Sequence, residues 1–399
     1  MSAQVTLSKV RSIAVIEVNN PPVNALGHAV RKGLWDSIEA AEADDTVKAI
    51  VVIGAGRTFP AGADINEFGT VMREPYLPDV IDRIEVCKKP VVAALHGTAL
   101  GGGFEVALGS HYRIAPADAR IGLPEVNLGL LPGAGGTQRM PRLCGAKLTL
   151  DVMLSGKPIS AAKAHAAGLI DRLAEGDLRS EAIQFAEEVQ TIRRSRDEEK
   201  GFLDTKSYHE ALDDAKKMIS TRMRGQLAPI KIIECVTAAL EKPFAEGRAF
   251  ERASFFECLS SEQSKGMIHA FFAERASAKV PEASRAKPRK LESIGVVGGG
   301  TMGAGITVAA LDSGLPVTMI ERDAESIARG RANVEKVYDR LVAKGRKTKD
   351  QKAAVMALYT ASTDYGDLSD VDMVIEAVFE RLDVKREVFA KLDEVIKPS

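Results

Sequence analysis

The stretch from Pro90 to Arg139 decides the fold and reads PVVAALHGTALGGGFEVALGSHYRIAPADARIGLPEVNLGLLPGAGGTQR. Its apolar run Val91–Leu95 lies between a proline and a His-Gly pair, which is typical of a buried strand that ends in a loop. Three glycines, Gly101–Gly103, then precede a helical segment at Phe104–Leu108. Such a loop leaves backbone N–H groups unpaired at a helix start, where the helix dipole favours negative charge. The sequence therefore predicts a strand, an anion-binding turn and a helix, in that order.

Two carboxylates accompany this turn. Glu105 lies in the first turn of the predicted helix, and Glu125 follows Pro124 further along the chain. Two carboxylates beside a backbone anion site are the groups that acid–base chemistry on a carbonyl compound requires. Each feature also has a structural interpretation. Three glycines can form a tight turn and nothing more, and a Glu at a helix start can simply compensate the dipole.

The combination of motifs resembles a known family. The pattern GxALGGGxExA, followed by PExxLGxxPGxGGTQR, is similar to the signature of the enoyl-CoA hydratase/isomerase (crotonase) superfamily, and the upstream Ala61–Asp64, AGAD, resembles its companion loop. The resemblance implies that Glu105 and Glu125 are catalytic. It also implies that the backbone N–H groups of Ala63 and Gly102 form an oxyanion hole for a thioester. Taken alone, AGAD is also compatible with a turn and a helix capped by its Asp.

Composition excludes several other classes of function. With 399 residues, of which 45% are hydrophobic, the chain is long enough for two or three domains with ordinary cores. A net charge of −1 gives no indication of a nucleic-acid partner. The four cysteines lack metal-ligand spacing and are typical of thiols in a reducing compartment, so no metal site is predicted. No signal peptide, no membrane-spanning run of ~18 apolar residues and no GxSxG hydrolase motif is expected.

Strands and helices alternate through the first part of the chain, which predicts an α/β fold. We expect a helix at Val30–Asp44 and another at Lys147–Leu154. The resemblance implies a crotonase-type spiral core with C-terminal helices, then a linker and a partial Rossmann doubly wound domain. The predicted divisions are a core over 1–190, a helical closing and connecting segment over 191–280, a linker rich in proline, small and basic residues over 281–292, and an NAD-binding domain over 293–399.

The last part of the chain has the pattern of a dinucleotide-binding unit. A predicted strand, Ile294–Val297, leads into GGGTMG and an apolar helix, and a second strand, Pro316–Ile320, ends at Glu321. Gly298, Gly300 and Gly303 suit the tight turn, the close approach of a pyrophosphate and the helix–strand packing of such folds. Glu321 can then hydrogen-bond the ribose 2′-OH of NAD. A lone glycine motif is weak evidence, but here its strand, helix, second strand and acid occur in order.

This part resembles the NAD-binding domain of 3-hydroxyacyl-CoA dehydrogenases, which implies that Glu376, Glu380 and Lys385 lie near the cofactor. The order of domains resembles the multifunctional fatty-acid β-oxidation enzymes. In those, the catalytic residues of the dehydrogenase lie further along than Ser399, so we expect no dehydrogenation by this chain alone. The resemblance also implies coenzyme A thioesters as substrates and a thiolase subunit as a candidate partner. A bacterial cytoplasm and, alternatively, a peroxisome fit the sequence.

For the first part, the resemblance implies hydration of 2-trans-enoyl-CoA to 3-hydroxyacyl-CoA. Glu105 would activate water and Glu125 would deliver a proton to C2. Migration of a 3-enoyl double bond to the 2-position is a second candidate activity. Two alternatives stay open at this point: an enzyme with isomerase activity only, and a non-catalytic module that binds CoA and NAD.

Overall fold

The computed structural model describes residues 4–67, 73–277, 279–280, 283, 286–287 and 289–397. The chain divides into two compact units, Met1–Lys279 and Val280–Ser399. Part of the predicted linker 281–292 lies outside the described residues. The helices after residue 190 contribute to the same hydrophobic core as the preceding residues, and a boundary at that position stays a prediction.

A six-stranded sheet forms the centre of the first unit, with the order β1-β2-β3-β4-β6-β9. The hairpin β1–β2 is antiparallel, and the other neighbouring strands pair in parallel. Its strands are β1 Val5–Val10, β2 Ile13–Val18, β3 Ala49–Gly54, β4 Val91–Ala94, β6 Tyr112–Pro116 and β9 Arg172–Ala174. Every residue of β3 and β4 is buried. This explains their continuous apolar sequence, since a parallel sheet is covered on both faces.

A smaller sheet brings the two halves of the central motif together. It consists of β5 Thr98–Leu100, β7 Arg120–Gly122 and β8 Ile159–Ser160, in that order. The strands β5 and β7 run in parallel, and Leu100 lies opposite Gly122. The segments that follow these two strands therefore begin side by side. They are helix α3, Gly102–Gly109, and the 3₁₀ helix η2, Glu125–Leu128.

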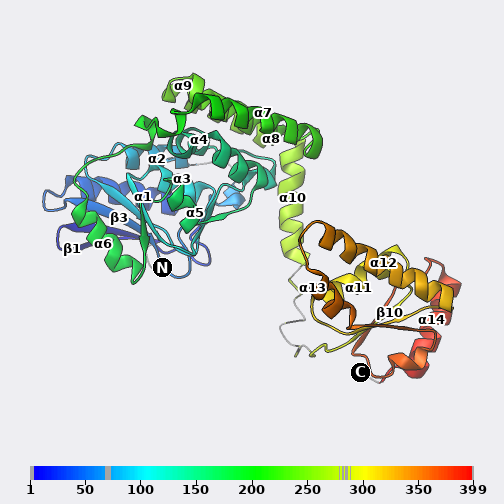
Figure 1. Ribbon diagram of the computed structural model, residues 1–399. Coiled ribbons are helices and arrows are strands. Elements are labelled where there is room, and N and C mark those ends of the chain that lie inside the picture. The colour runs from blue at the N-terminus through cyan, green and yellow to red at the C-terminus, as the bar shows by residue number, and fades with distance from the viewer. Residues whose placement is uncertain are drawn as a thin grey trace. The chain divides into compact units, whose positions relative to one another are not determined.

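Helices cover both faces of the six-stranded sheet (Figure 1). Alternate residues of the central strands face helix α6, Leu178–Glu188, and the others face the main core. In Figure 1 helices α7, α8 and α9 lie together beside α4. The remaining helices of this unit are α1 His28–Ala43, α2 Leu77–Glu85, α4 Gly136–Ser155, α5 Ala161–Ala166, α7 Thr205–Arg222, α8 Leu227–Glu241, α9 Phe244–Ser260 and α10 Glu262–Ser277, with short 3₁₀ turns η1 Ile65–Glu67, η3 Ser195–Asp197 and η4 Lys200–Phe202.

Helix α4 contains the predicted helix Lys147–Leu154 after a kink, and before the kink a section that was not expected. This first section begins at Gly136 and contains Pro141. At Gly145 the backbone leaves the helical conformation, with φ of 78° and ψ of 176°. The two helix-breaking residues hide this first section in the sequence, because each disfavours a helix interior. The structure resolves the conflict with a kink at the glycine.

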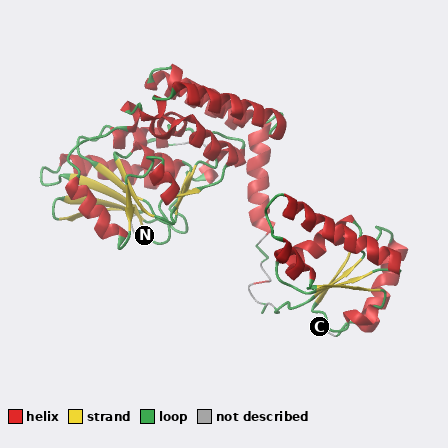
Figure 2. Cartoon of the chain, in the orientation of Figure 1, coloured by secondary structure: helices red, strands yellow, loops and turns green. Residues whose placement is uncertain are grey.

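The second unit is a doubly wound domain with the parallel strand order β12-β11-β10-β13. Figure 2 shows its strands between helices, and two separate apolar clusters occupy the two faces of the sheet. Its elements are β10 Ile294–Val297, α11 Thr301–Asp312, β11 Val317–Ile320, α12 Ala324–Ala343, α13 Lys349–Met356, β12 Tyr359–Ser362, the 3₁₀ helix η6 Tyr365–Leu368, β13 Met373–Glu376 and α14 Leu382–Val395. Numbered within the unit, this is the order 3-2-1-4, which matches the first four strands of the Rossmann order 3-2-1-4-5-6.

Candidate active site

Ala63 and Gly102 lie side by side. The Leu26 N–H donates to the Gly62 carbonyl at 2.9 Å and holds the upstream loop in place. A Cβ atom added to Gly102 would lie 3.3 Å from the Ala63 nitrogen. Neither the Ala63 N–H nor the Gly102 N–H donates to an acceptor among the described residues. The two N–H groups therefore lie close together, and their role as donors to one oxygen atom, which the resemblance implies, stays a prediction.

The contact between the two loops is made by backbone atoms. A Cβ atom at Gly103 would lie 1.7 Å from the Pro60 carbonyl oxygen, so no other residue fits there without moving one of the loops. Gly101, just before the helix, has φ of 52°, in the left-handed region that glycine adopts readily. The three glycines thus have distinct steric reasons for being in the turn.

Glu105 lies in the first turn of α3 and is 3% exposed. Its Oε1 accepts hydrogen bonds from the N–H groups of Ala134 and Gly136, each at 2.8 Å. Burial raises the pKa of Glu105 to about 7, and the negative charge of Glu251 acts in the same direction. The two N–H groups oppose this rise because they stabilise the carboxylate. The side chain can therefore gain or lose a proton near neutral pH.

Glu125 begins the 3₁₀ helix η2, beside the same turn. Its Oε1 would lie 3.1 Å from a Cβ atom added to Gly101. Its Oε2 is buried and has no hydrogen-bond partner among the described residues. Burial raises the pKa of Glu125 well above its usual value, and the charge of Glu105 raises it further. This side chain therefore favours the protonated form.

The four predicted residues line one cavity of about 160 Å³. Leu26, Ile65, Leu77, Leu128, Leu130 and Phe255 supply most of its apolar wall. An apolar wall excludes water and strengthens electrostatic interactions inside the site. The structure thus brings together Glu105, Glu125, Ala63 and Gly102, which are far apart in the sequence.

Sequence reasoning missed a third buried carboxylate near this cavity. Glu251 on α9 is fully buried, and its Oε2 accepts a hydrogen bond from the Thr137 N–H at 3.0 Å. A signal was available, because Gly247, Phe255 and Cys258 lie on the same buried face of the helix at helical spacing from Glu251. Arg248, one turn before it, contacts Asp82 at 3.4 Å.

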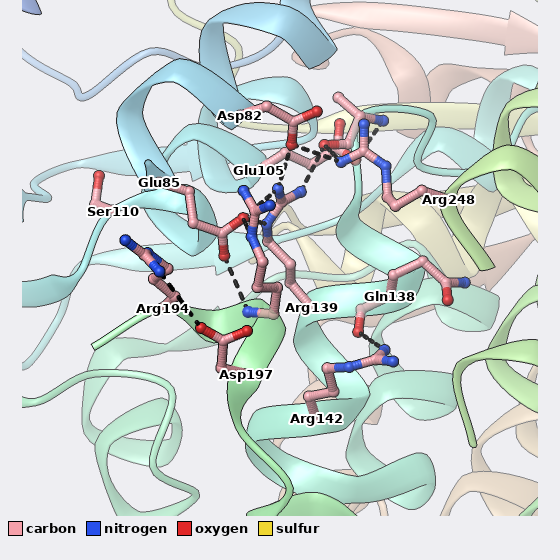
Figure 3. Close-up of polar contacts among 12 residues, drawn as sticks. Asp82, Glu85, Glu105, Ser110, Gln138, Arg139, Arg142, Arg194, Asp197 and Arg248 are labelled. Carbon is pink, nitrogen blue, oxygen red and sulfur yellow. Dashed lines mark hydrogen bonds and ion pairs between the residues drawn. The ribbon is translucent and has the colours of Figure 1, made fainter. Parts of the chain in front are cut away.

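A buried ion-pair cluster lies next to Glu105 (Figure 3). Arg139 contacts Glu85 and Asp82, each at 2.7 Å, and Arg196 contacts Glu85 at 2.8 Å. Burial alone would raise the pKa of Glu85, but the charges of the two arginines outweigh it and the pKa lies below its usual value. Gly135 is the residue that lets this cluster approach the turn, since a Cβ atom there would lie 1.8 Å from Arg139 Nη1.

The glycine loop of the second unit has the form that a dinucleotide needs. Gly298 has φ of +100°, and a Cβ atom at Gly303 would lie 1.7 Å from the Gly298 carbonyl oxygen. Gly300 has open space around its Cβ position, and no side chain caps the start of α11 there. An uncapped helix start beside an open glycine can accept a pyrophosphate group. The residues present therefore fit NAD.

The predicted acidic residues of this unit fall into two places. Glu321, at the end of β11, accepts a hydrogen bond from the Gly299 N–H at 2.5 Å. Glu376, at the end of β13, pairs with Lys385 at 2.7 Å, and Glu380 lies 3.3 Å from the same lysine. Strand β10 separates the two places, because it lies between β11 and β13 in the sheet.

Two kinds of feature are absent from the described part of the chain. No group of three or more His, Cys, Asp and Glu side chains there could hold a metal ion. No helix there is both long enough and apolar enough to cross a membrane.

Comparison with known proteins agrees with this geometry. Residues 8–224 match the enoyl-CoA hydratase/isomerase family, and residues 293–399 match the NAD-binding domain of 3-hydroxyacyl-CoA dehydrogenase. The chain is 39% identical over 398 residues to a peroxisomal bifunctional enzyme of Danio rerio, covering 98% of this chain and 54% of the relative. It is 38% identical over 408 residues to a peroxisomal fatty acid beta-oxidation multifunctional protein of Oryza sativa subsp. japonica, covering 97% of this chain and 55% of the relative. The chain thus spans about half the length of these relatives.

Solved structures resemble the first part of the chain. A carnitinyl-CoA hydratase from Mycobacterium avium aligns with a TM-score of 0.51 at 29% identity, covering 69% of this chain and 97% of that chain. An enoyl-CoA hydratase/isomerase from Pseudoalteromonas atlantica T6c aligns with a TM-score of 0.51 at 26% identity, covering 68% and 97%. Both resemblances seen in the sequence are confirmed. The chain belongs to the enoyl-CoA hydratase/isomerase family and carries, after that part, an NAD-binding domain of the 3-hydroxyacyl-CoA dehydrogenase type.

Proposed function

We propose that the first unit adds water to 2-trans-enoyl-CoA and forms 3-hydroxyacyl-CoA. One observation carries this proposal: two carboxylates with raised pKa values line the same cavity as two N–H groups that have no acceptor among the described residues. The thioester oxygen accepts hydrogen bonds from the Ala63 and Gly102 N–H groups. Each donor supplies about 3 kcal/mol as negative charge develops on that oxygen.

The surroundings of the two carboxylates support different roles. Glu105 is the general base, because its two N–H donors stabilise the ionised form. Glu125 is the general acid, because its buried Oε2 has no donor to stabilise a charge among the described residues. As the water oxygen bonds to C3, Glu105 takes the water proton and Glu125 gives its own proton to C2. Transfer of a proton from Glu105 to Glu125 then restores the starting state.

Isomerisation of a 3-enoyl to a 2-enoyl thioester is a second candidate activity. Glu125 lines the cavity and its Oε2 has no partner among the described residues, so in its ionised form this single carboxylate can take a proton from C2 and return it to C4. This reaction does not require Glu105. An isomerase that does not hydrate would therefore keep its rate when Glu105 is replaced.

The test is turnover of crotonyl-CoA, followed by loss of the absorbance of its conjugated thioester. We expect Glu105→Gln and Glu125→Gln each to lower kcat by about 10²–10⁴-fold. An inert wild-type chain would support the non-catalytic alternative, and full activity in both variants would exclude the proposed mechanism. A 3-enoyl-CoA substrate measured with the same variants tests the isomerase activity.

A glycine pair tests the oxyanion hole separately. Gly102→Ala places a methyl group 2.6 Å from the end of the Leu77 side chain and next to the Ala63 nitrogen, and should lower kcat by about 10²-fold. Gly266→Ala on α10 is the control, because nothing lies within 4 Å of its Cβ position. Equal activity in both variants would remove the oxyanion hole from the mechanism.

For the second unit we propose NAD binding. The glycines Gly298, Gly300 and Gly303 would surround the pyrophosphate, and Glu321 would hydrogen-bond the adenosine ribose. Glu376, Glu380 and Lys385 would lie near the nicotinamide half, and NAD would supply a hydride acceptor there. Titration with NADH should show a change in its fluorescence that Glu321→Ala weakens by about tenfold.

A partner and a compartment are also proposals. A thiolase subunit would be found by co-purification from the source cells. The two relatives named above are peroxisomal proteins, which supports the peroxisomal alternative over a bacterial cytoplasm. Sedimentation of the native protein with catalase-containing particles would support the peroxisome, and recovery in the particle-free fraction would support the cytoplasm.

A further inference from the structure

Helix α9 directs one carboxylate into the core, and the mechanism above does not use it. Glu251 is fully buried, and its Oε2 accepts hydrogen bonds from the N–H of Thr137 at 3.0 Å and from the Thr137 hydroxyl at 2.5 Å. The residue does not line the cavity. It therefore cannot act on a substrate directly.

Glu251 and Glu105 are bound by neighbouring peptide groups of one turn. The Ala134 and Gly136 N–H groups donate to Glu105, and the next N–H along, that of Thr137, donates to Glu251. This turn is the start of α4, where the helix dipole favours negative charge. A displacement of Thr137 would move the two donors of Glu105 with it.

Glu251 has one cation within ion-pair range among the described residues. Arg248 Nε lies 3.7 Å from Glu251 Oε1, too far for a hydrogen bond, and that oxygen has no hydrogen-bond partner there. Arg248 also donates to the Ala134 carbonyl at 3.2 Å. The charged and titratable groups that interact with Glu251 come from four other elements as well as its own: Arg248, Arg252, Glu105, Glu125, Arg139 and Cys235.

We propose that Glu251 is a positioning residue of the hydratase site. By accepting the two hydrogen bonds of Thr137, it fixes the turn that carries the N–H donors of Glu105. Its negative charge also keeps Glu105 able to take up a proton at neutral pH. This inference rests on the proposed hydration. The charge of Glu251 is the second cause, after burial, that raises the pKa of Glu105. Burial also raises the pKa of Glu251 itself, and Arg248, Thr137 and Arg139 oppose that rise by stabilising the ionised form. Glu251→Gln removes the charge and keeps an acceptor for Thr137, whereas Glu251→Ala removes both.

The experiment compares the pH dependence of kcat in the full chain. In Glu251→Gln the rise in kcat, which follows ionisation of Glu105, should move to lower pH by on the order of one pH unit, with the high-pH kcat kept. In Glu251→Ala the high-pH kcat should fall with little change in KM. Glu257→Gln is the matched control, since this exposed residue of the same helix pairs with Lys231 at 2.9 Å. It should leave the profile unchanged.

A second readout does not depend on turnover. The carboxyl infrared band of Glu105, identified by its loss in Glu105→Gln, should titrate at lower pH in Glu251→Gln. Thr137→Val should shift it in the same direction, because losing the hydroxyl donor makes Glu251 less charged, and this variant serves if Glu251→Gln does not fold. An inert wild type with a shifted band would overturn the hydration but keep the link between the carboxylates. An unshifted band, or an equal shift in Glu257→Gln, would overturn the inference.

Discussion

Glu85 and Glu105 are two buried carboxylates of the same unit with opposite properties (Figure 3). Glu85 contacts the guanidinium groups of Arg139 and Arg196, and its pKa is lowered. Glu105 contacts backbone N–H groups, has Glu251 as a charged neighbour, and has a pKa of about 7. Burial alone therefore does not make a proton-transfer group. The direction of the pKa shift depends on whether the buried carboxylate contacts a group of opposite charge.

The first prediction removes an ion-pair partner of Glu85. Arg139→Met leaves Glu85 and Asp82 without their shared partner, and should lower the free energy of unfolding by about 3–5 kcal/mol. Urea unfolding measures this loss. Lys32→Met removes an exposed pair with Asp36 and is the control, with an effect of at most about 1 kcal/mol. Similar losses in the two variants would mean that the buried cluster is no more important than a surface pair.

The second prediction concerns Glu105, the carboxylate with the raised pKa. The pKa of Glu105 rises from 4.5 to about 7 on folding, so the stability it contributes is complete below pH 4.5 and is lost as the pH rises to about 7. At about 1.4 kcal/mol for each unit of pKa, the loss is about 3 kcal/mol. Glu105→Gln should therefore gain stability relative to the wild type over this interval in denaturant titrations.

The same measurement on Glu85→Gln should show the opposite dependence of stability on pH. The pKa of Glu85 is lowered, so its contribution is present at neutral pH and is lost as the pH falls. This variant should be less stable than the wild type at neutral pH, with a difference that shrinks in acid. Parallel pH dependences for the two variants would contradict the comparison.

A third prediction raises the pKa of Glu105 further. Arg248 lowers the pKa of Glu105, so Arg248→Met should raise it and move the rise in kcat to higher pH. The shift should be smaller than that of Glu251→Gln and opposite in sign, because the charge of Glu251 has the larger effect on Glu105. The kcat–pH profile is the measurement, and a shift to lower pH would show that Arg248 acts in another way.

The smallest effect is expected at an exposed pair of the second unit. Lys290 and Glu292 are 2.5 Å apart, and their side chains are 84% and 66% exposed. Solvent screens such a pair, so Lys290→Met should leave the thermal midpoint of the second unit within replicate error. Calorimetry of the full chain would detect a shift, and a change as large as that of Arg139→Met would be inconsistent with screening.

Most of the cavity could be predicted from local patterns. The glycine turn and the apolar strand runs specify backbone conformation within a few residues, and the family resemblance supplied the distant Ala63. Glu251 was missed, although the helical spacing of Gly247, Phe255 and Cys258 is consistent with its lying on a buried face. Its position depends on helix α9 packing against α4, a contact between residues more than a hundred positions apart. No short motif marks it, and an isolated Glu on a helix is normally exposed.

The first section of α4, residues 136–144, was missed for a related reason. Pro141 and Gly145 disfavour a helix interior locally, but burial of Met140 and Leu143 in the main core stabilises the helix around them. Tertiary packing outweighs local propensity here. The strength of that packing is not visible in a sequence window.

The contact between Gly103 and the Pro60 carbonyl also limits how this protein can be redesigned. The two loops that carry the N–H donors are in van der Waals contact through their backbones, with no side chain between them that could be resized. Engineering for longer or bulkier acyl groups should therefore leave these loops alone. The adjustable wall is the side of the cavity formed by Leu128 and Leu130, where a smaller residue enlarges the space without moving either donor.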